Sequence, residues 1–254
     1  MRQTPLSQRI AIEVCSKLRD TDIDIRSLPG TCITNSITRQ KIYTPPTGKE
    51  VILTLLRNWE RFLHQETPKD PLLWMSIAHY QFEAIHPFSD GNGRTGRILN
   101  LLYLVEQGLL HSPVLYLSRC IIQHKNEYYE KLLGVTKNKD WESWNEFMLN
   151  AIEETANWTK NKIDGICRLE QRFKMKMEEI PSLKPIYSHE LIELLFTQPY
   201  IRIKDIVNAG IAKRQTASKY LQALHQENLL SMKSSEKEKL FINYQLLDLL
   251  NRED

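Results

Sequence analysis

Residues 86–97 read HPFSDGNGRTGR, and this short stretch decides how the rest of the chain is interpreted. Pro87 disfavours a helical conformation at the residue before it, so we expect a helix over 72–85 to end at His86. The Gly-Asn-Gly run at 91–93 then opens directly into an apolar helix. Glycines leave backbone N–H groups unobstructed, and such groups at a helix N-terminus bind anions. The stretch therefore predicts a phosphate site between two helices.

The charged side chains of the same stretch suit a nucleotide. Asp90 offers a hard oxygen ligand, and Mg²⁺ usually takes one or two carboxylates while keeping waters and substrate phosphates. Arg94 and Arg97 lie three residues apart on one helix face, where their guanidinium groups can hold further phosphate oxygens. His86 is placed to accept a proton from an attacking hydroxyl. Together these residues indicate phosphoryl or nucleotidyl transfer from a metal-bound nucleoside triphosphate.

Each of these features has an ordinary structural explanation when it stands alone. A loop histidine is usually structural or solvated, and Gly-Asn-Gly is usually a turn. The combination of a histidine, an acid, two glycines and two arginines within 12 residues has no simple packing rationale. A buried cluster of this polarity is costly without a ligand, which favours the functional interpretation.

The composition is that of a globular protein without a membrane segment. The chain has 254 residues and a net charge of +3, which is too small to imply nucleic acid by itself. No apolar run approaches the roughly 20 residues that a bilayer requires, and the N-terminus shows no signal-like core. Neither a disulfide framework nor a structural zinc site is expected, because no CxxC pair occurs among Cys15, Cys32, Cys120 and Cys167. We therefore expect a cytoplasmic protein with reduced thiols.

Apolar residues recur at helical spacing over most of the chain, as in 72–85, 97–110 and 144–158, so the expected fold class is mainly α. Residues 27–48 are the exception. They are rich in Thr, Ile and turn formers and end near Pro-Pro, which favours an irregular loop or a short hairpin. A charged segment over 160–180 has few apolar residues and is followed by PSLKP, whose prolines stop any preceding helix. We place a domain boundary there.

The C-terminal part has the element order of a winged helix-turn-helix domain. The sequence pattern predicts helices at 188–196, 203–209 and 213–227, a turn at Gly210, and strands near 229–232 and 239–243. A Lys, Ser and Glu-rich turn separates the two strands and corresponds to the wing.

The sequence HPFSDGNGR resembles the HPFx[DE]GNGR signature of the Fic family of protein adenylyltransferases, and Arg97 completes its longer form. The likeness covers essentially residues 5–250, because a winged helix also follows the Fic core in a bacterial subgroup. The resemblance implies a helical Fic core with a short flap hairpin, followed by a C-terminal winged helix domain. The expected divisions are a Fic catalytic domain over 1–158, a helical connector over 159–185 and a winged helix-turn-helix domain over 186–254.

The resemblance also implies a role for each residue of the motif. His86 is the base and Asp90 binds Mg²⁺. The phosphates of ATP are held by Gly91, Asn92, Gly93, Arg94, Thr95, Gly96 and Arg97. AMP passes from Mg-ATP to a Ser, Thr or Tyr hydroxyl of a target protein, or of the chain itself, and pyrophosphate leaves. The electrostatic stabilisation then comes from Mg²⁺, the backbone amides and the arginines.

Two further segments resemble parts of Fic proteins. The segment KIYTPP (41–46) is similar to the flap that registers a target segment by backbone pairing. The candidate target-binding residues are Ile42, Tyr43 and Thr44, and a proline-terminated surface loop is the alternative. The segment NEYYEKL (126–132) resembles the helix whose tyrosines approach the nucleotide base. This makes Tyr128 and Tyr129 candidates for ATP binding, with a place in the core as the alternative.

One motif of that Fic subgroup is missing from the sequence. Its N-terminal inhibitory helix carries an [ST]xxxE[GN] motif whose glutamate pairs with the second arginine. Here Glu227 is the only glutamate followed by Gly or Asn, and position 223 is Ala. The chain is therefore expected to be truncated, constitutively active, or restrained by an inhibitory helix in trans, and AMP removal is disfavoured. Fic relatives often pair, so a homodimer is expected.

In the predicted winged helix, 213–227 is the recognition helix, and Arg214, Gln215 and Lys219 are the candidate DNA contacts. Acidic residues dilute the wing, so a dimerisation or target-docking module is the alternative. The favoured function is a protein adenylyltransferase, an enzyme. The alternative is a DNA-binding transcriptional regulator with a nucleotide-sensing Fic pocket, in which His86 would have no catalytic role. A kinase-like or phosphocholine transferase is disfavoured, because the motif matches the adenylylating pattern without substitution.

Overall fold

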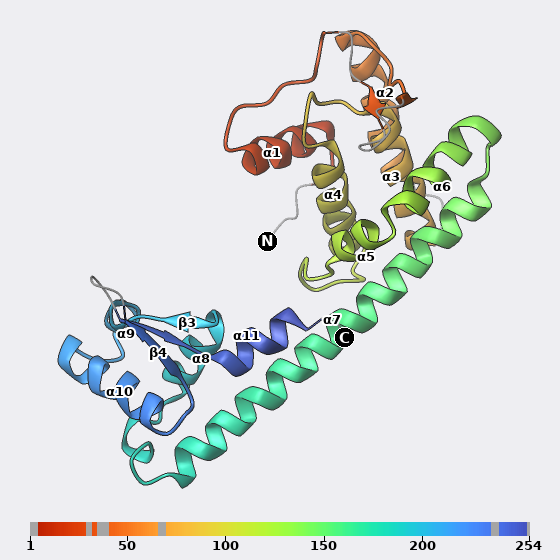
Figure 1. Cartoon of the computed structure of the whole chain (residues 1–254). Coiled ribbons are helices and arrows are strands. Elements are labelled where there is room, and N and C mark those ends of the chain that lie inside the picture. Colours follow the sequence, from red (N-terminus) through yellow and green to blue (C-terminus); the bar gives the residue numbers. More distant parts are fainter. Residues whose placement is uncertain (1–4, 29–31, 35–40, 66–69, 235–238, 253–254) are drawn as a thin grey trace. The chain divides into compact units, whose positions relative to one another are not determined.

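The computed structural model describes residues 5–28, 32–34, 41–65, 70–234 and 239–252. The chain forms two compact units, Met1–Thr159 and Lys160–Asp254. Helices dominate both units, so the predicted mainly α fold class is confirmed (Figure 1). Over the described ranges, every helix is either too short or too polar to cross a membrane.

The N-terminal unit consists of helices and one small antiparallel sheet. Its elements are α1 (Gln8–Arg19), β1 (Ile33–Thr34), β2 (Lys41–Tyr43), α2 (Lys49–Leu63), α3 (Pro71–Ile85), α4 (Asn92–Glu106), α5 (Leu117–Gln123), α6 (Lys125–Asn138) and the first part of α7 (Trp141–Glu179). Strand β1 pairs with β2, with Ile33 opposite Tyr43. This is the short hairpin expected within 27–48, and its tip at 35–40 lies outside the described residues.

The two helices around the motif have bounds that follow from their caps. The Asp70 carboxylate accepts the N–H groups of Leu72 and Leu73 at 2.8 and 3.3 Å, so α3 begins at Pro71. Helix α4 begins at Asn92, before the position that the apolar pattern indicated. It stops short of the predicted end at 110, because Gly108 adopts a left-handed conformation with φ 72°.

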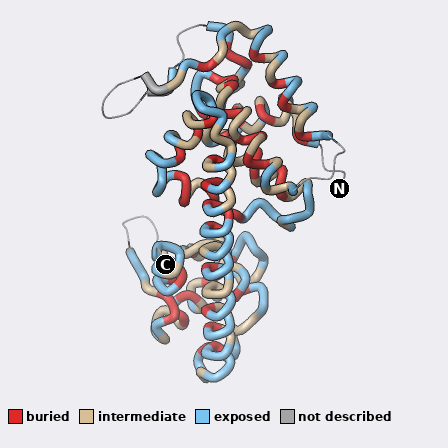
Figure 2. Tube along the Cα trace, turned by 90° about the vertical axis from the view of Figure 1, so that its right-hand side faces the viewer, coloured by how far each residue is buried: buried red, intermediate tan, exposed pale blue. Residues whose placement is uncertain are grey.

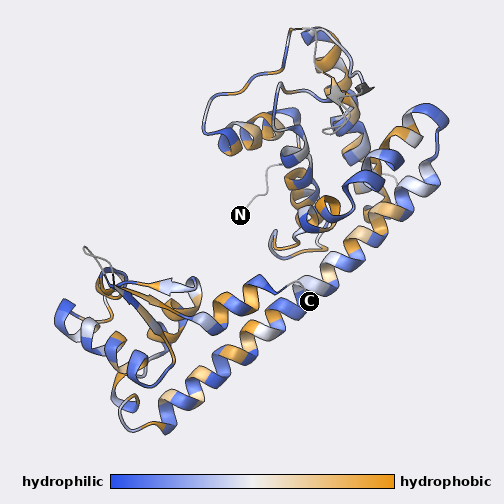
Figure 3. Ribbon diagram, in the orientation of Figure 1, coloured by the Kyte–Doolittle hydropathy of each residue, from blue (hydrophilic) through white to orange (hydrophobic). Residues whose placement is uncertain are grey.

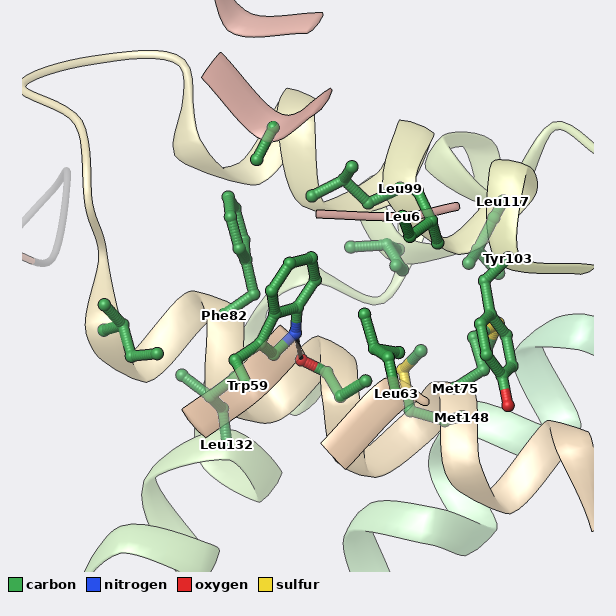
Figure 4. Packing of buried hydrophobic residues seen from close by; sticks show 14 of the residues in the cluster. Leu6, Trp59, Leu63, Met75, Phe82, Leu99, Tyr103, Leu117, Leu132 and Met148 are labelled. Atoms are coloured by element: carbon green, nitrogen blue, oxygen red, sulfur yellow. Dashed lines mark hydrogen bonds between the residues drawn. The ribbon is translucent and has the colours of Figure 1, made fainter. Parts of the chain in front are cut away.

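Helix α3 lies within the core of the N-terminal unit. Trp59 of α2 donates its indole N–H to the carbonyl of Ala78 at 3.0 Å, and Trp144 of α7 donates to the carbonyl of Ser76 at 3.0 Å. Figure 4 shows Trp59 beside Phe82, with their ring centroids 5.7 Å apart. Helices on several sides thus cover α3, which explains why its sequence is apolar nearly all round.

The C-terminal unit combines short helices with a three-stranded antiparallel sheet. Its elements are the second part of α7, a 3₁₀ turn (Lys184–Ile186), α8 (His189–Thr197), β3 (Tyr200–Ile201), α9 (Ile203–Asn208), α10 (Arg214–Gln226), β4 (Ser231–Ser234), β5 (Lys239–Ile242) and α11 (Tyr244–Asn251). The strand order is β3-β5-β4. The predicted helices and the predicted strand pair are present in the predicted order. Figure 2 shows that this unit, like the other, contains buried residues interspersed with exposed ones.

Two elements of this unit were not predicted. Strand β3 has two residues, too few for an alternating pattern, and it forms only by pairing with β5. Helix α11 begins at Tyr244 and is capped by Asn243, whose side chain accepts the N–H of Leu246 at 3.0 Å. No element was expected beyond the second strand.

Helix α7 contributes to both units. Its residues Trp144, Met148 and Ala151 are buried in the core of the N-terminal unit, whereas Leu169 and Phe173 are buried in that of the C-terminal unit. Figure 3 shows apolar and polar residues alternating along this helix. The segment 160–180 is thus helical up to Glu179, and it ends just before the prolines that the sequence marked as a stop. The three-part division of the chain stays a prediction.

Candidate active site

His86 follows α3 in a backbone conformation that few side chains adopt. Its φ and ψ angles are 50° and 60°, in the left-handed region, and its N–H still donates to the carbonyl of Phe82 at 3.0 Å. Residues other than glycine with such angles are uncommon and deserve a functional explanation. The imidazole is therefore fixed at the junction between α3 and the motif loop.

The His86 ring is held in its neutral form. Burial lowers the pKa of the imidazole to about 4, while a backbone carbonyl contact from Glu83 opposes this with a smaller effect. The Nδ1 atom is buried, so Nε2 is the nitrogen that an incoming hydroxyl can reach. At neutral pH His86 thus has the lone pair that a general base needs.

Arg26 holds the loop around His86, although nothing in the sequence singled it out. Its guanidinium donates to the carbonyl of His86 at 2.7 Å, to that of Ile85 at 3.4 Å, and to that of Pro46. Its own N–H donates to the carbonyl of Pro87 at 3.0 Å. One buried side chain therefore fixes the end of α3 and the base of the hairpin. The partners lie 20 and 60 residues away in sequence, beyond any spacing rule.

The N-terminus of α4 leaves backbone N–H groups outside the helical ladder. The first ladder bond runs from the N–H of Thr95 to the carbonyl of Gly91 at 2.9 Å, so the preceding N–H groups of the first turn have no helical acceptor. Gly91 has φ 88°, and a Cβ there would lie 3.3 Å from the Sγ of Cys15. Glycine is required for this turn. The exposed N–H groups and the helix dipole suit a phosphate.

The side chain of Asn92 closes the loop and does not face a ligand. Its Oδ1 accepts the N–H of Phe88 at 2.9 Å, and its Nδ2 donates to the carbonyl of Phe88 at 2.8 Å. The residue is 2% exposed. Only the backbone N–H of Asn92 can therefore take the expected part in ATP binding. Its side chain instead fixes the geometry of the loop before any ligand binds.

Asp90 is the motif residue that can hold Mg²⁺, and its surroundings fit a cation. Its side chain is 60% exposed, Oδ1 accepts the N–H of Gly91 at 2.7 Å, and Oδ2 forms an ion pair with Arg19 of α1. The guanidinium thus neutralises the carboxylate where a metal ion would do so. An exposed pair contributes only about 0–1 kcal/mol, so Mg²⁺ can displace Arg19 at small cost.

Arg97 reaches back over the first turn of α4, while Arg94 is exposed at that turn. A Cβ at Gly93 would lie 3.2 Å from the Nη1 of Arg97. The Nε of Arg97 donates to the Oγ of Ser118 on α5 at 2.9 Å. The guanidinium therefore lies beside the phosphate site and is oriented by a residue that sequence reasoning missed, because Ser118 is 21 residues away.

Thr95 and Gly96 are packed against the protein, which corrects their expected role as ATP ligands. Thr95 is fully buried, and its Oγ1 has no hydrogen-bond partner among the described residues. A Cβ at Gly96 would lie 2.6 Å from the Oε1 of Glu83 and 3.2 Å from the Cδ1 of Phe82. Gly96 thus allows the close approach of α4 to α3, and the buried side chain of Thr95 is not available to a nucleotide.

Two family models match the chain on either side of its centre. Residues 7–104, which include the whole motif loop, match the Fic/DOC family, and residues 170–246 match the C-terminal domain of the protein adenylyltransferase SoFic-like family. Residues 7–104 therefore belong to the Fic/DOC family.

Relatives of known name share the Fic part of the chain. It is 33% identical over 114 residues to the protein adenylyltransferase Fic of Culex quinquefasciatus and 32% identical over 114 residues to that of Drosophila yakuba. These matches cover 44% of this chain but only 21% and 22% of the relatives, so about a fifth of their length is represented. A Fic family protein from Desulfovibrio desulfuricans G20 superposes with a TM-score of 0.52 at 21% identity, over 91% of this chain and 67% of that one. This likeness supports the fold.

Tyr43 of strand β2 ties the predicted flap to α3. Its hydroxyl donates to the carbonyl of Ala84 on α3 at 2.9 Å, so the tyrosine faces the scaffold. Thr44 is exposed, and Ile42 contributes the backbone of β2. The side chain of Tyr43 is therefore a positioning group, and target binding by this segment stays a prediction that concerns its backbone and Thr44.

The two candidate tyrosines of α6 differ in their surroundings. Tyr128 is buried, its hydroxyl lies 3.0 Å from the Nε2 of His79, and its ring packs against Trp144. This is the core placement that stood as the alternative, so Tyr128 is removed from the nucleotide site. Tyr129 is half-buried and packs edge-on against Tyr128, and its role in ATP binding stays a prediction.

The candidate DNA contacts lie in the C-terminal unit, at the start of α10. Arg214, Gln215 and Lys219 are all exposed on this helix. Strands β4 and β5, which the sequence pattern predicted to flank the wing, pair with each other in antiparallel fashion, and residues 235–238 between them lie outside the described residues.

Proposed function

We propose that the chain is a protein adenylyltransferase that transfers AMP from Mg-ATP to a Ser, Thr or Tyr hydroxyl of a target protein. One observation carries this proposal: a half-buried histidine whose pKa is lowered to about 4 stands at the end of α3, and the motif loop leads from it to the N-terminus of α4. Membership of the Fic family and the names of the relatives support it. A pocket that only bound nucleotide would not need a base at this position.

The phosphates of ATP are placed over the first turn of α4. The backbone N–H groups at 92–94 and the guanidinium groups of Arg94 and Arg97 provide donors directed at phosphate oxygens. Asp90 is the residue that would hold Mg²⁺, which supplies charge neutralisation on the phosphates when it is bound. Asn92 and Arg26 keep the loop in shape, so the donors are positioned in advance.

The transfer step requires one proton acceptor. The target hydroxyl oxygen attacks the α-phosphorus of ATP, and the bond from this phosphorus to the bridging oxygen of the β-phosphate breaks. Nε2 of His86 takes the hydroxyl proton, and pyrophosphate leaves with the bond electrons. The products are an AMP-modified side chain and pyrophosphate.

The experiment supplies the purified chain and Mg²⁺ with ATP labelled at the α-phosphate or, in parallel, at the γ-phosphate, with and without cell lysate. Protein label from α-labelled ATP alone supports AMP transfer to the chain itself or to a target. Label from γ-labelled ATP would instead establish a kinase-like reaction and overturn the proposal.

The exposed Arg214, Gln215 and Lys219 on α10 favour a second candidate function, a DNA-binding regulator whose Fic pocket senses nucleotide. Such side chains contact phosphates and base edges when a helix enters the major groove. DNA binding that weakens steeply with salt, and that is lost when Arg214 and Lys219 are replaced by Ala, would support this candidate. An absence of salt-dependent binding would favour a docking module.

Three further features belong to the proposal. The protein acts in the cytoplasm, it pairs as a homodimer, and an inhibitory helix from another polypeptide restrains it through Arg97. The last point rests on the resemblance to Fic proteins in which an inhibitory glutamate pairs with the second arginine of the motif. Sedimentation of the purified chain tests the dimer.

A further inference from the structure

Three side chains that carry metal-binding atoms converge outside the motif loop. Cys120 lies on α5, His124 lies at the junction of α5 and α6, and Glu154 lies on α7, all within the N-terminal unit. The Cys120 Sγ, a ring nitrogen of His124 and a Glu154 carboxylate oxygen lie within 4.8 Å of one another. None of these residues takes part in the proposed AMP transfer.

The local backbone presents two of these side chains together. The N–H of His124 donates to the carbonyl of Cys120 at 2.9 Å, so the two residues are one helical turn apart and share a face. Sequence reasoning excluded CxxC and finger-like spacings and did not consider a cysteine and a histidine four residues apart. The third residue is 34 positions from Cys120, so no local pattern includes it.

The distances suit a tetrahedral metal ion. The Oε2 atom of Glu154 is 3.3 Å from the Sγ of Cys120 and 3.6 Å from the Nε2 of His124. Zinc bonds of normal length at tetrahedral angles place such ligand atoms roughly 3.4–3.6 Å apart. The three atoms therefore need only small movements to share one ion.

Arg119 sets the orientation of the carboxylate. Its Nη1 lies 3.2 Å from the Oε1 of Glu154, which leaves Oε2 directed at the thiol and the imidazole. Outer partners of this kind hold the ligands of metal sites in place. The arrangement thus has both a set of ligands and a group that positions one of them.

A cavity gives the cluster an open side. It has a volume of about 280 Å³, and its lining includes Cys120, His124 and Glu154 together with the carboxylates of Glu127 and Glu146. Excess acidic groups favour a cation, and the space admits a water or a further carboxylate as the fourth ligand.

We propose that Cys120, His124 and Glu154 form a binding site for a divalent transition-metal ion, with Zn²⁺ as the best match to this mixed sulfur, nitrogen and oxygen set. Without metal the thiol donates to Oε2 of Glu154. Burial and the neighbouring carboxylate raise the pKa of that thiol to about 12 in the metal-free protein. On binding, a bond forms from sulfur to the ion, and the thiol proton is released to solvent.

The test titrates the metal-free full chain with Co²⁺ as a spectroscopic probe and then with Zn²⁺ in competition. We expect one equivalent of Co²⁺ to produce a sulfur-to-metal charge-transfer absorption that Zn²⁺ removes. Cys120→Ser should abolish this band, and His124→Ala and Glu154→Gln should each weaken binding at least about tenfold. The side chain of His124 is 47% exposed, so its replacement should leave folding intact even if the buried Cys120 is sensitive.

Two matched variants act as controls. Cys167→Ser and His111→Ala remove an exposed cysteine and an exposed histidine away from the cluster, and both should bind as the unaltered chain does. The proposal is overturned if the charge-transfer band is absent from the unaltered chain, if it survives in His124→Ala and Glu154→Gln with unchanged affinity, or if Cys167→Ser removes it.

Discussion

His86 combines two features that are unfavourable for an ordinary histidine. Its backbone is left-handed, and its ring is buried enough to lower its pKa to about 4. Asn92, Arg26 and Pro87 enforce this geometry, each through the backbone of the loop. At the scale of the residue, this geometry keeps the proposed base unprotonated beside the proposed phosphate site.

This protonation state sets the pH dependence of AMP transfer. Activity needs neutral His86, so kcat/KM should fall with decreasing pH only as the pH passes through about 4 to 5, not near the ordinary histidine value of 6.5. The measurement is the pH profile of α-label transfer. The profile of His111→Ala, which lacks an exposed histidine, should coincide with it. An acid limb centred near 6.5 would contradict the assignment.

Glu83 should make the free energy of unfolding fall as the pH rises, whereas the rate of AMP transfer should rise with pH. Burial raises its pKa from 4.5 to about 7, so the native state binds a proton that the unfolded state releases between these values. The corresponding stability is present below pH 4.5 and is lost as the pH rises through 7. The free energy of unfolding of Glu83→Gln, minus that of the unaltered chain, should therefore increase by about 2–3 kcal/mol from pH 4.5 to pH 8.

Urea unfolding at several pH values measures this difference. Glu153→Gln provides the matched control, because it makes the same change of side chain at an exposed position. A difference between Glu83→Gln and the unaltered chain that does not change with pH would show that Glu83 is ionised in the folded protein.

At the scale of elements, the site depends on how closely α4 approaches α3. Gly96 is the contact point, and a Cβ there would lie 2.6 Å from the Oε1 of Glu83. Helix α5 also takes part, since its Ser118 orients Arg97 and its Cys120 belongs to the proposed metal site. The geometry of the site therefore depends on the positions of α4 and α5 as well as on the residues of the motif.

Two glycine-to-alanine substitutions distinguish the effect of this close contact on stability from the effect of helix propensity. Alanine in place of a helical glycine normally stabilises by about 1 kcal/mol. Gly134→Ala in α6 should do so, because its new Cβ would lie 3.7 Å from the nearest atom. Gly96→Ala should instead destabilise by about 1–3 kcal/mol, since the side chains around it are buried. Equal stabilisation of both variants in denaturant unfolding would refute the close contact.

At the scale of the whole molecule, the two units have separate cores. All five tryptophans of the chain belong to Met1–Thr159, so tryptophan fluorescence reports the N-terminal unit alone. Phe173, Leu221 and Phe241 are buried in the other core. Helix α7 is the element that both cores include.

Separate cores predict separate effects of core substitutions. Leu221→Ala removes a buried side chain from the C-terminal unit and should destabilise that unit by about 2–5 kcal/mol without moving the midpoint of the tryptophan transition. Leu56→Ala, equally buried in the N-terminal unit, should move that midpoint. A shift of the tryptophan transition in Leu221→Ala as large as that in Leu56→Ala would show that the units unfold as one.

The sequence predicted the parts of the molecule that depend on local patterns. The end of α3 at the residue before His86, the turn from His86 to Gly91 and the helices α8 to α10 follow from prolines, glycines and apolar spacing. Contacts between distant segments were not predictable. The hydrogen bonds from Arg26 to the loop and from Cys120 to Glu154 depend on how distant segments pack. A two-residue strand such as β3 is too short to show an alternating pattern.

The most direct test of the central claim compares His86→Ala with the unaltered chain. Both are incubated with Mg²⁺, α-labelled ATP and lysate, while ATP binding is measured in parallel. Our account predicts that His86→Ala keeps ATP binding, because the phosphate donors belong to α4, and loses AMP transfer by at least about 100-fold. Transfer by His86→Ala at a rate close to that of the unaltered chain would contradict the assignment of His86 as the base.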